Sequence, residues 1–299
     1  AVQTHRPDVL CTDLHMPRMD GLELTRRVME THPCPILVIS VSVRDDDRTN
    51  VFRLIEAGAV DVFPKPRGGL DRGDHRFAQA LARRVRTLSR VDVFRRPARS
   101  RPVPDTPPPV RRHRPHVIVI GGSTGGVQAM EAIVRELPHD FPIPLLYIQH
   151  ISEGFLPALI SWLGSRGRLP VAEAVPGSLL LPGRVYLPPE GHHLTLDEIG
   201  HVQTPDTPAR NGHRPSIDTT FESVAHYYGA TALGILLTGM GRDGAAGLRA
   251  IRDAGGWTIA QTPADAVISG MPRAAIELDA ATDTCPLSQI AQLLKALDR

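Results

Sequence analysis

Residues 116–126 read HVIVIGGSTGG, and this stretch decides the fold of the C-terminal part of the chain. The apolar run 116–120 has the length and the β-branched composition of a buried strand. The glycines of 121–126 then turn the chain, and apolar residues at helical spacing follow from residue 127 to residue 137. A buried strand, a tight turn and an amphipathic helix in this order predict a parallel α/β sheet.

The alternation of strand and helix continues on both sides of this stretch. Before it, we predict strands at 8–12, 36–40 and 60–63, and helices at 22–30, 46–57 and 77–88. After it, we predict strands at 145–149, 232–237 and 258–261, and helices at 127–137 and 245–254. Residues 171–203 contain Pro-Gly and Glu-Gly turns, which predict a small β-rich insertion of short strands.

Residues 91–115 separate two such α/β domains. Seven prolines and seven arginines lie between residues 94 and 115, together with one aspartate. Proline fixes φ and removes a backbone donor, so this segment is predicted to be an extended linker between domains at 1–90 and 116–299. Because the linker holds the excess of positive charge, the net charge of +2 does not indicate a nucleic-acid partner.

The composition of the 299 residues limits the class of protein. Hydrophobic residues make up 41% and charged residues 22%, which excludes disorder throughout the chain. The longest apolar runs are far shorter than the ~18 residues that span a bilayer, so we expect no membrane insertion. Three separate cysteines without a C-x-x-C motif predict neither a disulfide framework nor a thiolate zinc site, and we expect a cytoplasmic protein.

Ser123 lies in the turn between the strand at 116–120 and the next helix, in a G-x-S-x-G pattern. Small neighbours expose its hydroxyl, and the amides at the helix N-terminus can stabilise an oxyanion, so Ser123 is a candidate nucleophile. The alternative is a phosphate-binding turn. The dinucleotide pattern G-x-G-x-x-G fails because Ser123 occupies the place of the second glycine.

Two further residues are placed at the same edge of the sheet. His150 follows the strand at 145–149, and Asp243 lies in a glycine-rich turn after the strand at 232–237. The carboxyl ends of parallel strands lie side by side, so His150 can take the proton of Ser123 and Asp243 can orient His150. The alternatives are a structural histidine and an aspartate that caps the helix at 245–254. The chain order of the three differs from that of α/β-hydrolases.

A metal centre is not predicted. His192 and His193 are adjacent, so on a strand they would point to opposite faces, and with Asp197 they match no zinc spacing. The turn around Asp243 contains one acid, where a calcium loop needs several.

In the N-terminal domain, Asp13, Ser40 and Lys65 each lie at or just after the end of a predicted strand. They are therefore expected to meet at one edge of the sheet, where a carboxylate, a hydroxyl and an ammonium group can handle a phosphoryl group. The alternative is an aspartate that caps a turn and a solvated lysine.

The N-terminal domain resembles a response-regulator receiver domain, which has a flavodoxin-like fold. The segments that carry the resemblance are PDVLCTD at 7–13, MPRMDG at 16–21 and AGAVDVFPKP at 57–66. The resemblance implies that Asp13 accepts a phosphoryl group, that Ser40 is the switch hydroxyl and that Lys65 contacts the phosphate.

The first two strands of that family, the helix between them and the acidic pair of its Mg²⁺ site have no counterpart in these 299 residues. We therefore expect a fragment of a longer protein with a partial receiver domain. Acyl phosphates with Mg²⁺ are expected to change the activity of its second domain little.

The C-terminal domain resembles the catalytic domain of the CheB family of chemotaxis protein-glutamate methylesterases. The matching segments are IGGSTGG at 120–126, IQH at 148–150, LPG at 181–183, HRPSID at 213–218, LTGMGRDGAAG at 237–247 and TIAQ at 258–261. The resemblance implies a three-layer α/β domain with Ser123 as nucleophile, His150 as general base and Asp243 as orienting acid. It also places Thr124 and Met240 at the oxyanion pocket.

The reaction that the resemblance implies is hydrolysis of glutamate methyl esters on the cytoplasmic helices of methyl-accepting chemoreceptors, with deamidation of receptor glutamines as a second activity. The resemblance also implies that catalysis needs no cofactor, and that in this family the histidine kinase of the pathway phosphorylates the receiver domain with Mg²⁺. Two alternatives stay open at this point. The same hydrolase acts in another signalling pathway, or the chain is a phosphorelay binding module without catalysis.

Overall fold

The computed structural model describes residues 2–40, 45–65, 75–91 and 114–298. It contains two compact units, each described by itself below. Most of the predicted linker lies outside the described residues. Within the described ranges, no helix is long and apolar enough to cross a membrane.

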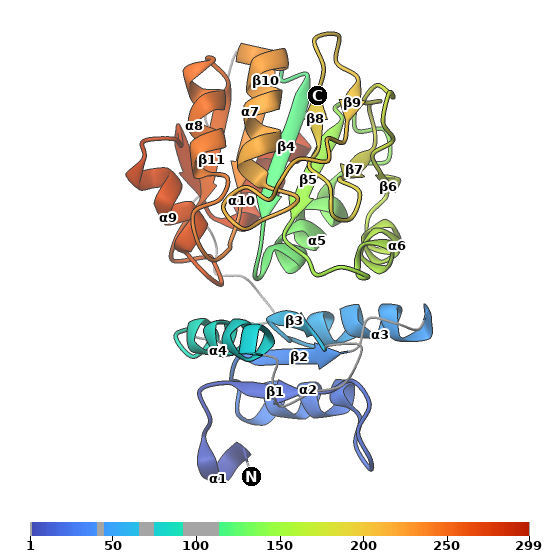
Figure 1. Ribbon diagram of the computed structural model, residues 1–299, viewed down its shortest axis with the longest axis vertical. Coiled ribbons are helices and arrows are strands. Elements are labelled where there is room, and N and C mark those ends of the chain that lie inside the picture. Colours follow the sequence, from blue (N-terminus) through green and yellow to red (C-terminus); the bar gives the residue numbers. More distant parts are fainter. Residues whose placement is uncertain (1, 41–44, 66–74, 92–113, 299) are drawn as a thin grey trace. The chain divides into compact units, whose positions relative to one another are not determined.

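The N-terminal unit contains a parallel three-stranded sheet in the order β1-β2-β3 (Figure 1). Its elements are α1 (Val2–His5), β1 (Leu10–Thr12), α2 (Gly21–Thr31), β2 (Ile36–Ser40), α3 (Asp45–Glu56), β3 (Asp61–Pro64) and α4 (His75–Leu88). The predicted strand at 36–40 is confirmed, and the other predicted elements lie within two residues of their observed bounds. The sequence analysis did not assign α1.

The C-terminal unit is built on a parallel seven-stranded sheet in the order β12-β11-β10-β4-β5-β7-β6. The strands of this sheet are β4 (Val117–Gly122), β5 (Leu145–Gln149), β6 (Val171–Glu173), β7 (Val185–Leu187), β10 (Ala232–Leu236), β11 (Trp257–Gln261) and β12 (Asp283–Cys285). β4 lies at its centre, between β10 and β5. The predicted parallel α/β sheet is therefore confirmed.

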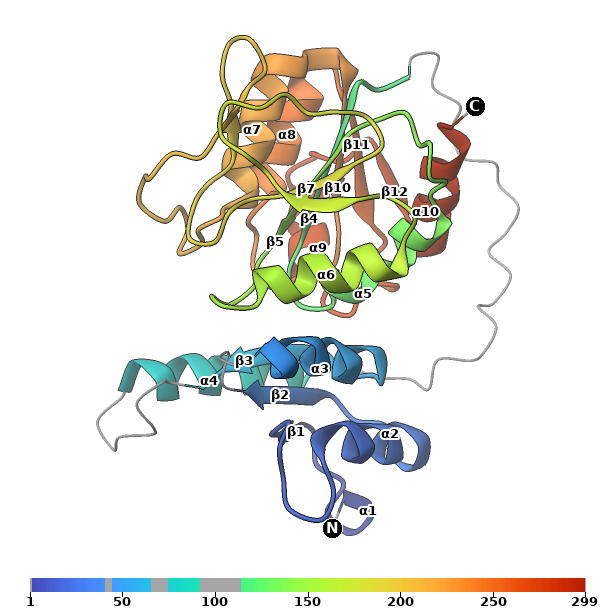
Figure 2. The same ribbon diagram turned by 90° about the vertical axis from the view of Figure 1, so that its right-hand side faces the viewer.

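Helices cover both faces of this sheet and make a three-layer domain (Figure 2). The helices are α5 (Gly126–Glu136), α6 (Leu156–Arg166), α7 (Ile217–Tyr228), α8 (Ala245–Asp253), α9 (Gly270–Glu277) and α10 (Leu287–Ala296), with a 3₁₀ turn, η1, at Gly229–Thr231. α7 and α8 pack together on one face, and α5 and α10 pack together on the other. Val117 and Val119 of β4 belong to the apolar cluster beneath α7 and α8, as the alternation of side chains along a strand requires.

Residues 171–203 do not form one β-rich insertion, because two of their strands belong to the main sheet and two form a separate pair. β6 and β7 extend the main sheet in parallel register, with Val171 opposite Val185. β8 (Thr195–Leu196) and β9 (Val202–Gln203) form a separate antiparallel pair. The β-rich insertion is therefore smaller than predicted, because the apolar segment at β7 is buried as a sheet strand.

Phe221 of α7 is fully buried in the apolar cluster, and a Cβ added at Gly247 of α8 would lie 2.5 Å from its Cβ. Phe221→Ala is expected to lower the free energy of unfolding by about 3–5 kcal/mol. Urea denaturation followed by tryptophan fluorescence measures this change, because Trp162 and Trp257 both lie in the C-terminal unit. The exposed Ile276 is the control, and an equal loss in Ile276→Ala would contradict the prediction.

Candidate active site

Ser123 lies in the turn that joins the central strand β4 to α5. Its backbone N–H donates to the carbonyl oxygen of Thr238 at 3.0 Å, and its carbonyl oxygen accepts from the N–H of Gly126 at 2.8 Å. Gly125 has a φ of 79°, in the left-handed region that favours glycine. These bonds hold the turn at the carboxyl edge of the sheet. Ser123 is buried there, so the prediction that small neighbours expose its hydroxyl is wrong.

His150 follows β5, which pairs with β4 in parallel register. Its backbone N–H donates to the carbonyl oxygen of Gly122 at 3.0 Å, so the strand pairing itself places His150 beside the Ser123 turn. The amide of Gln149 donates to the carbonyl oxygens of Ser123 and His150, at 2.8 and 3.0 Å. The prediction that parallel strands bring these two segments together is confirmed.

The imidazole of His150 is held on two sides. Its Nε2 lies 2.8 Å from Oδ2 of Asp243, and the ring stacks on that of His213 with centroids 3.8 Å apart and planes 3° apart. Its Nδ1 is buried and has no hydrogen-bond partner among the described residues. Because Nε2 faces the carboxylate, Nδ1 is the nitrogen that is left to accept a proton.

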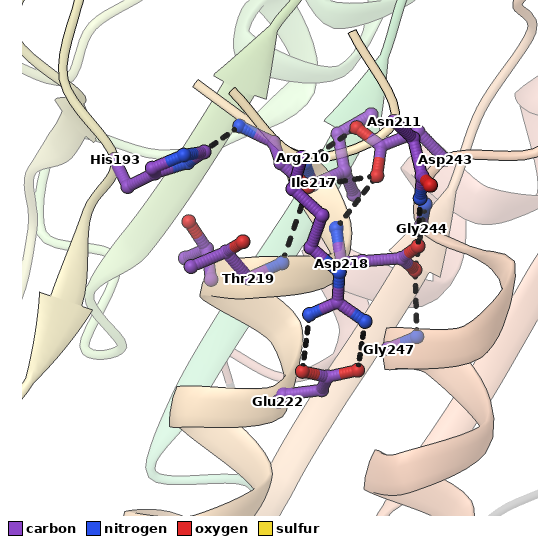
Figure 3. Close-up of polar contacts among 12 residues, drawn as sticks. His193, Arg210, Asn211, Ile217, Asp218, Thr219, Glu222, Asp243, Gly244 and Gly247 are labelled. Carbon is purple, nitrogen blue, oxygen red and sulfur yellow. Dashed lines mark hydrogen bonds and ion pairs between the residues drawn. The ribbon is translucent and has the colours of Figure 1, made fainter. Parts of the chain in front are cut away.

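Asp243 is buried and accepts four hydrogen bonds, of which those from the start of α7 are drawn in Figure 3. Besides Nε2 of His150, the donors are Oγ of Ser216 at 2.9 Å, the N–H of Ile217 at 2.8 Å and the N–H of Asp218 at 3.1 Å. Three of its four donors thus come from the start of α7. The alternative that Asp243 caps α8 is not what the structure contains, because the cap residue of α8 is Gly244.

The surroundings of Asp243 keep it ionised. Burial acts to raise its pKa, but the hydrogen bond and charge of His150 and the N–H groups of Ile217 and Asp218 outweigh burial, so the pKa lies well below the ordinary value. A carboxylate of this kind can hold one tautomer of His150 and stabilise the imidazolium.

Thr124 and Met240 lie in the two turns that border Ser123. Thr124 is buried, and its carbonyl oxygen accepts from Oγ1 of Thr238 at 3.0 Å. Met240 is 38% exposed. A Cβ added at Gly239, the residue before Met240, would lie 2.7 Å from Cβ of Ser123. Both residues are therefore near Ser123, and their part in an oxyanion pocket stays a prediction.

His193 joins the loop before α7 to this network. It is buried, its Nδ1 accepts from the N–H of Ser216 at 3.1 Å, and its Nε2 donates to the carbonyl oxygen of Pro208 at 3.1 Å. His192 bonds the carbonyl oxygen of Glu190, and Asp197 accepts N–H groups of the turn between β8 and β9. Over the described residues, no three acidic, histidine or cysteine side chains gather as they would around a metal ion.

Comparison with known proteins places these features in a family. Residues 118–294 match the family model of the CheB methylesterase, and residues 1–71 match that of the response regulator receiver domain. The chain belongs to the CheB methylesterase family.

Named relatives of this CheB methylesterase cover nearly its whole length. It is 40% identical over 302 residues to protein-glutamate methylesterase/protein-glutamine glutaminase 4 of Geobacter metallireducens, covering 99% of this chain and 87% of the relative. It is 42% identical over 294 residues to protein 2 of the same name from Anaeromyxobacter dehalogenans, covering 98% and 84%. The crystal structure of the Thermotoga maritima CheB methylesterase catalytic domain matches with a TM-score of 0.59 and 35% identity, over 61% of this chain and 98% of that one.

In the receiver part of this CheB methylesterase, Asp13 follows β1, Ser40 is the last residue of β2 and Lys65 follows β3. Nζ of Lys65 donates to Oδ2 of Asp13, and Oδ1 of Asp13 accepts from the N–H of Leu14 at 2.8 Å. The N–H of Lys65 donates to the carbonyl oxygen of Ser40 at 2.8 Å. The structure thus brings Asp13, Ser40 and Lys65 to one edge of the sheet, while their roles in phosphorylation stay predictions.

Two residues around the catalytic aspartate candidate of this CheB methylesterase had no role in the sequence analysis. Ser216 is the N-cap of α7 and donates to Asp243. Asp218, in the first turn of α7, accepts from the N–H groups of Gly244 and Gly247 at 2.9 and 2.7 Å. A serine before a run with an acid in its first turn is the pattern of a helix N-terminus, so a signal for the helix was present. Its link to Asp243 required the structure.

Proposed function

We propose that this CheB methylesterase hydrolyses methyl esters of glutamate side chains on chemoreceptor cytoplasmic helices, and deamidates glutamines at the same kind of site. The observation that carries the proposal is the buried His150–Asp243 pair, 2.8 Å apart, whose histidine is joined by its backbone N–H to Gly122 in the turn that holds Ser123. The names of the relatives give the substrate and both activities for those proteins. Because the receptor helices that carry such esters are cytoplasmic, we place the protein in the cytoplasm.

In the first step, Oγ of Ser123 attacks the ester carbonyl carbon while Nδ1 of His150 takes the hydroxyl proton. Asp243 holds the imidazolium through Nε2. The oxyanion lies toward the turn amides at the start of α5, with Thr124 and Met240 at the border of the pocket.

When the tetrahedral intermediate collapses, the carbon–oxygen bond to the methoxy group breaks and His150 returns the proton to it, so methanol leaves. Water then gives a proton to His150 and its oxygen attacks the acyl carbon. The bond to Ser123 breaks, the proton returns to Oγ, and glutamate is released. With a glutamine side chain, the same acyl intermediate forms as ammonia leaves. These steps use protein groups and one water molecule.

For the receiver domain, we propose that Asp13 accepts a phosphoryl group from the histidine kinase of the pathway, with Ser40 and Lys65 contacting it. Phosphorylation of receiver domains uses Mg²⁺, which takes several oxygen ligands. In the described part of the chain, Asp13 is engaged by Lys65, and no cluster of three acidic or histidine side chains surrounds it. The described residues therefore do not fit the ion by themselves, and we assign it no step.

The proposal is tested with a methylated chemoreceptor cytoplasmic fragment. We expect release of methanol, with loss of methyl esters in equal amount by mass spectrometry of the fragment. A fragment with glutamine at the modified positions is expected to release ammonia. Reaction of the protein with a fluorophosphonate reagent is a separate readout of a nucleophilic serine. If folded protein showed no release and no labelling, a binding module without catalysis would be favoured. Labelling without release would indicate a different ester substrate.

A further inference from the structure

Two buried carboxylates, Asp218 and Asp243, lie at the starts of the neighbouring helices α7 and α8. Each accepts hydrogen bonds from backbone N–H groups at the start of the other helix. Asp243, just before α8, accepts the N–H groups of Ile217 and Asp218 at the start of α7. Asp218, on α7, accepts the N–H groups of Gly244 and Gly247 at the start of α8. The exchange is reciprocal (Figure 3), and each carboxylate supplies acceptors that a helix N-terminus lacks.

The contact from Asp218 reaches the backbone of Asp243 directly. The N–H of Gly244 belongs to the peptide unit whose carbonyl group is that of Asp243, so the 2.9 Å bond to Asp218 fixes the plane from which the Asp243 side chain starts. The cap residue of α8, Gly244, has a φ of 92° and offers no side-chain cap. Among the side chains that the structure describes here, Asp218 is the one that holds these two amides.

The surroundings of Asp218 raise its pKa above the ordinary value, with burial as the largest cause. Burial raises its pKa, and the nearby charge of Asp243 adds to the rise, while the N–H of Gly247 and the charge of Arg210 act against it. Arg210 forms a bidentate ion pair with Glu222 one turn further along α7. Asn211 also reaches Asp218, at 3.5 Å.

We propose that Asp218 is a positioning residue of the catalytic triad. Through Gly244 and Gly247, its Oδ1 holds the turn so that Asp243 lies where it accepts Nε2 of His150. The expected effect of an Asp218 substitution on kcat rests on the proposed function. Its expected effect on the His150–Asp243 hydrogen bond does not.

The test compares three variants of the full chain. Asp218→Ala removes both acceptors. Asp218→Asn keeps a carbonyl oxygen at Oδ1, the atom that receives both amides, and removes the charge. Thr220→Val is the matched control, because Thr220 is a buried residue of the same helix whose Oγ1 donates to Leu194, away from Asp243. Tryptophan fluorescence and urea denaturation establish that each variant is folded.

We expect Asp218→Ala to lower kcat about 10- to 100-fold with little change in KM, because displacement of a catalytic group by about 1 Å costs rate of this order. Asp218→Asn is expected to stay within a few-fold of the wild type, and Thr220→Val likewise. A loss of kcat in Asp218→Asn as large as in Asp218→Ala would overturn the proposal, as would an equal loss in Thr220→Val.

A second readout is independent of turnover. The Nε2 proton of His150 bound to Asp243 gives a downfield ¹H NMR resonance, which we expect in the wild type, Asp218→Asn and Thr220→Val and not in Asp218→Ala. A wild-type resonance in folded Asp218→Ala would overturn the proposal. If the wild type lacks esterase activity, the proposed function fails and this readout still decides the role of Asp218.

Should Asp218→Ala not fold, Asp218→Glu takes its place. Glutamate keeps the charge, adds one methylene to the buried site and moves the acceptor oxygen, so only protein shown to be folded by urea denaturation is compared. Loss of the resonance and of kcat in folded Asp218→Glu supports the proposal, and wild-type values for both overturn it.

Discussion

Ser123→Ala is expected to lower kcat for methyl ester hydrolysis by about four orders of magnitude or more, the size of loss found when a triad nucleophile is removed. No other group takes its place in the proposed mechanism, because His150 is set to transfer protons and Asp243 is buried behind it. The same substitution is expected to abolish labelling by a fluorophosphonate and to leave KM for the receptor fragment nearly unchanged.

The fold should survive this substitution. The backbone bonds of residue 123 to Thr238 and Gly126 do not involve the hydroxyl, and alanine fits the space of serine. Ser165→Ala is the matched control, because Ser165 lies in α6 and its Oγ donates to the carbonyl oxygen of Trp162 at 2.7 Å, outside the site. Folded Ser123→Ala protein that kept a tenth or more of wild-type kcat would exclude Ser123 as the nucleophile.

The parts of the site that were predictable from the sequence are those set by sheet geometry. Strand β5 was predicted with its observed bounds, and a parallel pair places the residues after two neighbouring strands side by side. The segments of Ser123 and His150 therefore meet although 26 residues lie between them, and their backbones are joined by the hydrogen bond from His150 to Gly122.

The unpredicted parts depend on contacts that no local pattern contains. α7 begins after a proline-rich polar loop and has β-branched and aromatic residues, so its helical signal is weak. Ser216 donates its N–H to His193 and its hydroxyl to Asp243, and these two bonds join segments far apart in the chain. Which nitrogen of His150 faces Asp243 follows from ring orientation alone. α10, by contrast, has apolar residues at helical spacing, a signal that the predictions did not use.

Asp243→Asn is expected to lower kcat about 10⁴-fold while the protein remains folded, as the corresponding amide does in other triads. The reason lies in the donors around it. Oδ2 of Asp243 accepts from Nε2 of His150 and from the N–H of Ile217, whereas Oδ1 accepts from Ser216 and the N–H of Asp218. An amide has only one acceptor oxygen. In Asp243→Asn, the NH₂ group therefore faces two donors that it cannot accept hydrogen bonds from.

Either orientation of the amide has a cost. With NH₂ toward His150, the imidazole must present an acceptor at Nε2 and carry its proton on Nδ1, which then cannot take the proton of Ser123. With NH₂ toward Ser216, that hydroxyl can rotate, but the N–H of Asp218 loses its buried partner at a cost of about 1–3 kcal/mol. We therefore expect a lower free energy of unfolding together with the loss of kcat.

The acid dependence of stability separates the charge of Asp243 from its hydrogen bonds. The pKa of Asp243 in the folded protein lies below its unfolded value, so its contribution to stability is present above the unfolded pKa and is lost as pH falls toward the folded one. In Asp243→Asn, the free energy of unfolding is expected to fall less between neutral and acidic pH, because the contribution of this carboxylate is missing. Urea denaturation at a series of pH values measures this difference. Asp253→Asn is the control, because Asp253 is an exposed residue at the end of α8, the helix that Asp243 precedes, and this variant keeps the contribution of Asp243. If folded Asp243→Asn hydrolysed receptor esters at a rate within tenfold of the wild type, Asp243 would not be part of the triad, and its buried charge would serve only to hold the start of α7.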